Sequence, residues 1–286
     1  MKLSDSISTA AKSLKSIVKI TLQSRRHTIS HIQEDEASRP LIIMGNGPSL
    51  ADTIRLHSQA LYSNPTLAVN FAANAPEFTS LKPRYYLLAD PHFFTGKDDA
   101  NVARLTDNLA TAVTWEMTLF VPVQSIGSVA SGIKANPAIK IETFNAVGVE
   151  GWQWLEGTAF RNGRGMPRPR NVLIPSIMVG ILMGYRQIYI TGADHSWTRT
   201  ISVNDRNEVV SIQPHFYKED EKEIERVRTD YLRYPLHQIL YSFYVAFKSY
   251  FAIARHASRI GVEIYNATPE SFIDAFPRKP LPETAQ

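Results

Sequence analysis

Short apolar runs alternate with stretches of helical periodicity along most of this chain. The apolar runs predict buried strands at residues 41–44, 66–70, 85–89, 113–121, 140–144, 187–191 and 262–265. Between them, apolar residues recur every three or four positions and predict helices at about 50–62, 99–111 and 172–184. Strands that alternate with helices are typical of a parallel sheet with helices on both faces. We therefore predict an α/β fold whose sheet is mostly parallel.

The first part of the chain differs from the rest, and we divide the protein into a segment 1–36 and a domain 37–286. Apolar residues recur at helical spacing in the segment: Leu3, Ile7, Ala10, Leu14 and Ile17. Lysines at positions 12, 15 and 19 occupy other faces of the same helix, and a polar linker follows. Two interpretations are open. The helix packs against the domain, or it is a basic amphipathic helix that lies on an anionic membrane.

A second apolar stretch, "ILYSFYVAFKSYFAIA" at 239–254, comes closest to a membrane span. It is shorter than the ~18–20 residues that a span needs, and it contains Lys248. We predict a buried core helix, with a membrane-surface helix or an oligomer interface as the alternative. A homo-oligomer is therefore an open possibility.

Residues 195–222 break the alternation and predict a lid. The segment is polar and rich in turn residues, and a connection this long inside a compact α/β domain is usually a lid or disordered. Its three aromatic residues and its two histidines, His195 and His215, favour a lid. After the last strand, Thr268 and Pro269 predict the start of another helix.

Charge and composition narrow the classes of partner. The 286 residues carry a formal net charge of +4, which mildly favours nucleotides, phospholipid headgroups or acidic glycans. No nucleic-acid-binding motif is visible, so nucleic acid is not expected as a partner. The absence of cysteine excludes disulfides, thiolate metal sites and a cysteine nucleophile. No secretion signal is visible, and we expect a cytoplasmic location, at the inner face of the membrane if segment 1–36 binds lipid.

The stretch "LIIMGNGPSL" at 41–50 is a strand that ends in a glycine-rich turn. Gly45 and Gly47 match two of the three glycines of the dinucleotide-binding pattern, in the right strand-to-helix context, and the third is missing. A dinucleotide site also needs an acid at the end of the second strand, where this chain has Asn70. NAD is therefore disfavoured. The amides of Asn46 and Asn70 instead suit a base edge or a sugar hydroxyl.

Two more predicted strands end in polar clusters, at Asp90 and at Asp194-His195-Ser196. Because the carboxyl ends of parallel strands meet at one edge of a sheet, these side chains are expected to line one crevice. Each aspartate could instead cap the helix that follows it. No D-x-D motif occurs and no spacing typical of a zinc site is present, so no metal is expected.

In order along the chain, "IIMGNGPSL", "AVN", "MGYRQIYITGADHSW" and "HFY" resemble two related groups of bacterial proteins over residues 40–275. One is the family of CMP-sialic acid transferases that act on lipooligosaccharide. The other is the motility-accessory or MptE-like glycosyltransferases of capsules and flagella. The resemblance implies a single Rossmann-like, GT-A-like domain with a lid. It also implies inverting, metal-independent transfer of a nonulosonic acid or Kdo from a CMP donor to a glycan or glycolipid acceptor.

The resemblance also implies roles for particular residues. Asn46 and Asn70 match the family positions that contact CMP, and His215 matches the general base. His195 and Asp194 are the alternative catalytic residues. We expect the remaining ligand contacts at Gly45, Gly47, Ser49, Asp90, Arg170, Ser196 and Tyr217.

The chain departs from the sialyltransferases in two places. Their hydroxyl-bearing aromatics are replaced by His195-Ser196-Trp197, and their Ser/Thr-Gly by "RPRNVLIPS". Support for the departing phosphate is then expected from Arg168, Arg170, Ser196 or Tyr217. Two other classes stay open: a Mg²⁺-dependent pterin-type pyrophosphokinase, and a nucleotide-binding protein without catalytic activity.

Overall fold

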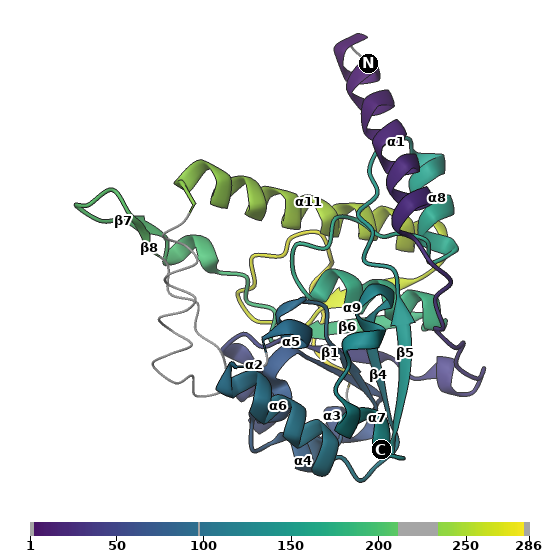
Figure 1. Ribbon diagram of the computed structural model, residues 1–286, viewed down its shortest axis with the longest axis vertical. Coiled ribbons are helices and arrows are strands. Elements are labelled where there is room, and N and C mark those ends of the chain that lie inside the picture. Colours follow the sequence, from purple (N-terminus) through teal and green to yellow (C-terminus); the bar gives the residue numbers. More distant parts are fainter. Residues whose placement is uncertain (1–2, 97, 211–233, 283–286) are drawn as a thin grey trace.

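The computed structural model describes residues 3–96, 98–210 and 234–282, and its centre is a seven-stranded sheet in which every neighbouring pair is parallel (Figure 1). The strand order is β5-β4-β3-β2-β1-β6-β9. The strands are β1 (Leu41–Met44), β2 (Thr66–Val69), β3 (Tyr85–Leu87), β4 (Met117–Pro122), β5 (Ile139–Phe144), β6 (Gln187–Thr191) and β9 (Glu263–Asn266). The predicted α/β, Rossmann-like parallel sheet is confirmed.

The chain reverses its direction across the sheet at β1. Strands β2 to β5 follow one another on one side of β1, and β6 then pairs with its other side. In open sheets of this kind, ligands bind outside the carboxyl ends of the strands at this switch point. The topology therefore predicts a ligand site in the crevice beyond β1 and β6.

Helices cover both faces of the sheet, and the side chains of β1 alternate between the two layers. Leu41 and Ile43 pack with α8, α9 and α11, whereas Ile42 and Met44 pack with the helices from α2 to α7. The helices among the described residues are α1 (Leu3–Gln23), α2 (Ser49–Leu56), α3 (Ser58–Ser63), α4 (Phe78–Leu81), α5 (His92–Thr95), α6 (Ala100–Thr111), α7 (Ser131–Ala135), α8 (Gln153–Arg161), α9 (Leu173–Met183) and α11 (Leu236–Arg259).

Two predicted elements differ in the structure. The expected helix at 50–62 is two helices, α2 and α3, separated at His57. The strand expected from Val113 begins at Met117. Trp115, which precedes it, donates a hydrogen bond from its indole nitrogen to the Pro83 carbonyl.

The helix expected at Thr268 is absent from the described chain between β9 and residue 282. Thr268 Oγ1 instead accepts a hydrogen bond from the Ala193 amide at 3.1 Å. The Arg278 guanidinium donates to the Thr268 and Ser271 carbonyls and holds the segment in a turn. Thr268 therefore supports the end of β6 and does not cap a helix.

Residues 24–38, the expected linker, lie against the sheet and its helices. The Thr28 amide donates to the Thr143 carbonyl and the Ile32 amide donates to the Met183 carbonyl. Glu36 is buried and accepts hydrogen bonds from Tyr85 and Tyr185, and Arg84 pairs with it at 2.9 Å. These contacts connect the end of the N-terminal segment to the start of β3.

Helix α11 has two different faces. Tyr250, Ile253 and Ala257 are buried in the core, as predicted, while Tyr241 and Tyr244 are exposed. None of the helices that the structure describes has the length and apolarity needed to cross a membrane.

The described part of the expected lid is a short helix, η4 (Trp197–Arg199), and an antiparallel hairpin of β7 (Ser202–Val203) and β8 (Val209–Val210). The hairpin extends away from the sheet at the left of Figure 1. His215, Tyr217 and the helix expected after them lie outside the described residues.

Candidate functional site at the switch point

A pocket of about 530 Å³ lies beyond the carboxyl ends of β1 and β6. The segment before α9 forms one wall, and Ser242, Phe243 and Ala246 of α11 form another. The structure brings most of the expected site residues together in its lining: Gly45, Asn46, Gly47, Asn70, Asp90, Arg170, Asp194, His195 and Ser196. The volume is within the usual range for small-molecule sites.

The glycine turn after β1 is shaped by its neighbour, the end of β6. The Gly45 amide donates to the Thr191 carbonyl at 2.7 Å, and the Gly47 amide donates to the Gly192 carbonyl at 2.8 Å. A Cβ atom at Gly45 would lie 2.5 Å from the Gly192 carbonyl oxygen. The two glycines thus allow the strand ends to approach closely. Their amides are already paired with carbonyls of residues 191 and 192, so a ligand contact at these two glycines would not use their N–H groups.

Asp194 holds the start of α2. Its Oδ2 accepts hydrogen bonds from the Ser49 hydroxyl at 2.8 Å and from the Ser49 amide at 3.4 Å. A Cβ atom at Gly47 would lie 2.0 Å from the same oxygen. Asp194 therefore acts as a cap across the crevice, and Ser49 contributes to the site through Asp194, since it does not line the pocket itself.

Asn46 lines the pocket and has a buried side-chain acceptor without a partner among the described residues. Its Nδ2 donates to the Val69 carbonyl at 3.1 Å, while its Oδ1 is buried and has no partner among the described residues. A buried polar atom without a partner is costly, so this oxygen is suited to accept a hydrogen bond from a ligand.

Asn70 has a left-handed backbone, with φ of 51°. The Tyr86 hydroxyl donates to the Asn70 carbonyl and accepts from the Ala73 amide, which fixes this turn. His195, on the opposite side of the crevice, also has φ of 51°. Residues other than glycine in this region are uncommon and gather at functional sites.

Asn171 is a site residue that the sequence analysis missed. Its Oδ1 accepts from the Tyr250 hydroxyl at 2.9 Å and from the Leu173 and Ile174 amides at the start of α9. Because all three partners donate, the amide orientation is fixed. Its Nδ2 is then a buried donor without a partner among the described residues, and Asn171 lines the pocket. The available signal was an asparagine directly before the apolar run of α9, which is typical of a helix cap.

His195 is buried, and its ring lies against three aromatic residues, Trp197, Phe247 and Tyr250. Nε2 lies 2.7 Å from the Tyr250 hydroxyl, and the ring centroid lies 4.1 Å from that of Trp197. Since Tyr250 donates to Asn171, His195 must donate from Nε2 to Tyr250. Burial lowers the pKa of His195 to about 3. At neutral pH the ring is therefore a neutral hydrogen-bond donor, and it is poorly suited to act as a general base.

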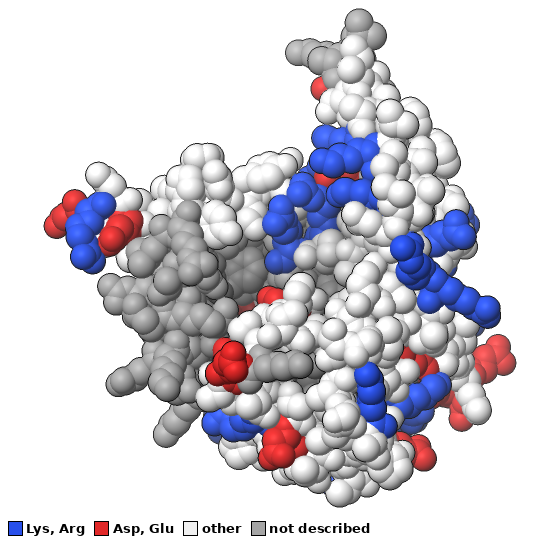
Figure 2. Space-filling model, in the orientation of Figure 1, with Lys and Arg blue, Asp and Glu red and all other residues white. Residues whose placement is uncertain are grey.

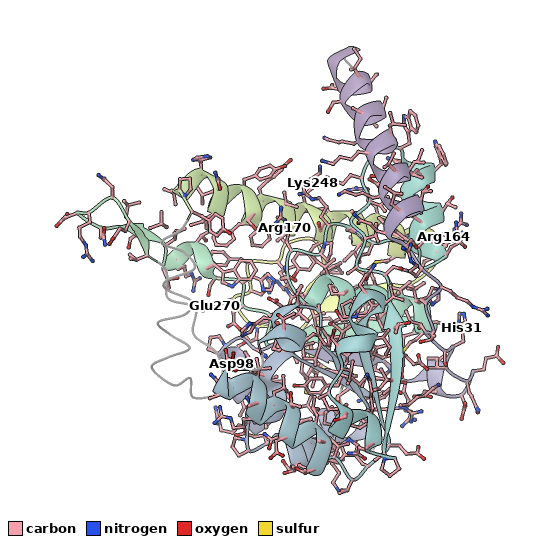
Figure 3. All side chains as sticks on the ribbon, in the orientation of Figure 1. His31, Asp98, Arg164, Arg170, Lys248 and Glu270 are labelled. Atoms are coloured by element: carbon pink, nitrogen blue, oxygen red, sulfur yellow. The ribbon has the colours of Figure 1, made fainter. Side chains whose placement is uncertain are left out.

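The remaining lining gives the pocket an aromatic side and a charged rim. The rings of Trp197 and Phe243 lie 5.2 Å apart on the aromatic side. At the rim, Asp90 accepts from the His92 amide, and Arg170 lies between α11 and the sheet (Figure 3). Within the described residues Arg170 has no ion pair. Ser242 adds a hydroxyl that the sequence did not indicate.

Metal ligands were not expected from the sequence. Among the residues that the structure describes, no group of three or more His, Asp or Glu side chains is arranged to hold a metal ion.

The buried state of His195 predicts a pH-dependent stability. Its pKa is about 3 in the folded protein and 6.5 when unperturbed, so the unfolded chain binds more protons as the pH falls. The contribution of neutral His195 to the free energy of unfolding is complete above pH 6.5 and is lost as the pH falls toward 3. Between about pH 7 and about pH 5, the free energy of unfolding should fall by about 2 kcal/mol more in the wild type than in His195→Gln. Urea denaturation at the two pH values measures this difference.

Burial also lowers the pKa of His256, together with the charges of Arg161 and Arg259. That residue is present in both proteins, so its effect cancels in the comparison. Equal pH dependence of the wild type and His195→Gln would contradict the buried, neutral state of His195.

Fold and site together define a Rossmann-like α/β protein with a polar pocket at the switch point. No protein-family model matches the sequence, and a search of curated proteins finds no match. Among solved structures, the MAf glycosyltransferase from Magnetospirillum magneticum AMB-1 aligns with 95% of this chain, at a TM-score of 0.51 and 11% identity. The alignment covers 38% of that larger chain, so this protein corresponds to part of it.

At this level of identity the likeness shows a shared fold. The neighbour is a motility accessory factor, one of the two groups that the sequence motifs resemble. The sialyltransferase type gains no support from this comparison.

Proposed function

We propose that the protein is a glycosyltransferase that transfers a nonulosonic acid or Kdo from a CMP donor, and that the pocket at the switch point binds the CMP. The observation that carries this proposal is that two residues lining one pocket each have a buried side-chain atom without a hydrogen-bond partner among the described residues. Asn46 offers a buried acceptor and Asn171 a buried donor. A nucleotide can satisfy both, because its sugar hydroxyls or base amino group donate while its phosphate oxygens accept.

Other features of the pocket fit the same ligand. The aromatic side, with Trp197 and Phe243, suits a flat ring, and Arg170 suits a phosphate oxygen. Asn70 replaces the acid that would bind an adenosine ribose, which argues against a dinucleotide. Support from the fold comes from the likeness to a protein described as a glycosyltransferase.

The proposed reaction is a direct displacement with inversion. The acceptor hydroxyl oxygen bonds to the anomeric carbon, the bond from that carbon to the phosphate oxygen breaks, and CMP leaves with the electron pair. The hydroxyl proton passes to a general base. We assign stabilisation of the leaving phosphate to Arg170 and Ser196, which line the pocket, and Tyr217 is a further candidate from the sequence.

We assign the base to His215 on two grounds. The resemblance places the family's base at this position, and the burial that lowers the pKa of His195 argues against the main rival. Among the described residues, His195 is the histidine that lines the pocket. One carboxylate oxygen of Asp194 accepts a hydrogen bond from Ser49, so we assign Asp194 a structural role and not the role of the base.

The proposal is tested by calorimetric titration of CMP into variants of the two strand-end amides. Asn46→Ala and Asn70→Gly should each weaken binding by about 1–3 kcal/mol, the usual cost of removing a buried hydrogen bond. Glycine is chosen at Asn70 because it accepts the left-handed backbone without strain.

Asn74→Ala is the matched control. Asn74 belongs to the same turn as Asn70, but its amide donates to the Asn101 carbonyl and it does not line the pocket. If both site variants bind CMP with wild-type affinity, the assignment of CMP to this pocket is wrong.

A further inference from the structure

Helix α1 packs on the body of the protein through its small polar side chains. Ser13 and Ser16 are 0% and 4% exposed. The Ser16 hydroxyl donates to the Glu150 carbonyl at 2.7 Å, and the Ser13 hydroxyl accepts from the Trp152 amide at 2.8 Å. The helix projects beyond the rest of the molecule in Figure 1. A surface helix normally has the opposite arrangement, with its apolar side chains packed inward.

The apolar side chains of α1 form an exposed stripe. Ile7, Leu14, Val18 and Leu22 repeat at intervals of seven and four residues, and they are 49–65% exposed. Their spacing places them on one side of the helix, away from the two buried serines. The described part of the protein contains no partner for this stripe. An exposed apolar surface of this kind marks an interaction site.

Two exposed tryptophans form a second apolar surface, at the contact between α1 and the body. Trp152 and Trp154 stack at 5.9 Å between ring centroids and are 40% and 63% exposed. The amide of Trp152 is the group that binds Ser13, so the pair lies beside α1. Exposed tryptophan is typical of the boundary between lipid tails and headgroups.

Basic side chains flank the apolar stripe on one side of α1. Helix α1 carries Lys12, Lys15 and Lys19, and Asp5 is the one acid among its described residues. Figure 2 shows Lys and Arg gathered around α1 and its base, while acidic side chains lie mostly toward the other end of this face.

The basic surface reaches the pocket. Burial lowers the pKa of Lys19, and the nearby charges of Lys15, Arg168 and Arg170 lower it further. Arg170 lines the pocket, while Arg168 and Lys248 both lie against Glu150. The rim of the pocket and the lysine side of α1 are thus neighbours.

We propose that the exposed stripe of α1 and the Trp152–Trp154 pair form a membrane-docking face that binds bilayers of anionic phospholipid. Apolar side chains would enter the headgroup region while lysines contact the phosphates. A second copy of the chain is disfavoured as the occupant, because pairing two α1 helices would bring their lysines together with Asp5 as the one acid on each helix. If the proposed glycosyltransferase function holds, this face brings the pocket to a lipid-linked acceptor.

The test is flotation of the full chain with vesicles of phosphatidylcholine, with and without phosphatidylglycerol. The wild type should float with the anionic vesicles, float much less with the neutral ones, and be released as salt rises. Leu14→Glu with Val18→Glu should abolish flotation. Lys12→Gln with Lys15→Gln should lower the partition coefficient on the order of 30-fold, from about 1 kcal/mol per lysine.

Leu56→Glu is the matched control, since Leu56 is 61% exposed on α2, and it should float like the wild type. The proposal is overturned if the wild type floats equally with anionic and neutral vesicles, or if the variant with Leu14→Glu and Val18→Glu still floats. It is also overturned if light scattering shows a wild-type dimer that the same two substitutions convert to monomers. CMP titration of each variant separates the membrane-docking proposal from the proposed function. Vesicle binding can fail while CMP binding is intact, and CMP binding can fail while vesicle binding is intact.

Discussion

Replacing His215 by alanine should lower kcat by ~10²–10⁴-fold, which is the usual contribution of a general base. The expected change follows from the proposed mechanism, in which the acceptor proton passes to this residue. CMP affinity should change little, because the proposed CMP contacts are at the strand ends. Steady-state transfer from a CMP-sugar, with CMP titration in parallel, measures both quantities.

His195→Gln is the comparison for this experiment. Glutamine retains a donor for the Tyr250 hydroxyl, so the hydrogen bonds around Asn171 are expected to persist. A loss of kcat in His195→Gln that exceeds the loss in His215→Ala, with the fold intact by circular dichroism, would place the base at the strand end. If neither variant loses activity, Asp194 or Asp90 becomes the candidate.

The second large effect is expected from Asn171→Asp. The substitution keeps the oxygen that caps α9 and accepts from Tyr250, so folding should be preserved. It replaces the unpaired Nδ2 donor by a carboxylate oxygen at the proposed CMP site. Repulsion of the CMP phosphate together with the lost hydrogen bond should weaken binding by ~10²–10³-fold.

Asn101→Asp is the charge-matched control, because Asn101 lies on α6 outside the pocket and its side-chain oxygen already accepts from Arg104. The stability of both variants is measured by urea denaturation. Unchanged CMP binding in Asn171→Asp would mean that the Nδ2 group of Asn171 does not contact the nucleotide.

The sequence was most informative where strands end. The apolar runs locate β1 and β6 to the residue, and the polar residues that follow them meet in one pocket because parallel strands end at a common edge. The sequence therefore predicted the sheet and most of the polar side chains that line the pocket.

Contacts between distant segments could not be predicted in the same way. The chain from His195 through Tyr250 to Asn171 joins three segments, and no local pattern relates them. The role of Thr268 was missed for a similar reason: Thr-Pro is a good helix start, but the pairing of Thr268 with Ala193 decides its conformation. The occupied amides of Gly45 and Gly47 depend on how closely β1 approaches β6, which only the folded structure shows.

The most direct test of the central claim is calorimetric titration of the wild-type protein with CMP and, separately, with ATP and Mg²⁺. CMP should bind at one site per chain, equally well with EDTA and with Mg²⁺, and Asn171→Asp should weaken this binding by ~10²–10³-fold. Such a result would support a metal-independent nucleotide site between β1 and β6. Binding of ATP only with Mg²⁺, and no binding of CMP, would contradict the account and favour a pyrophosphokinase.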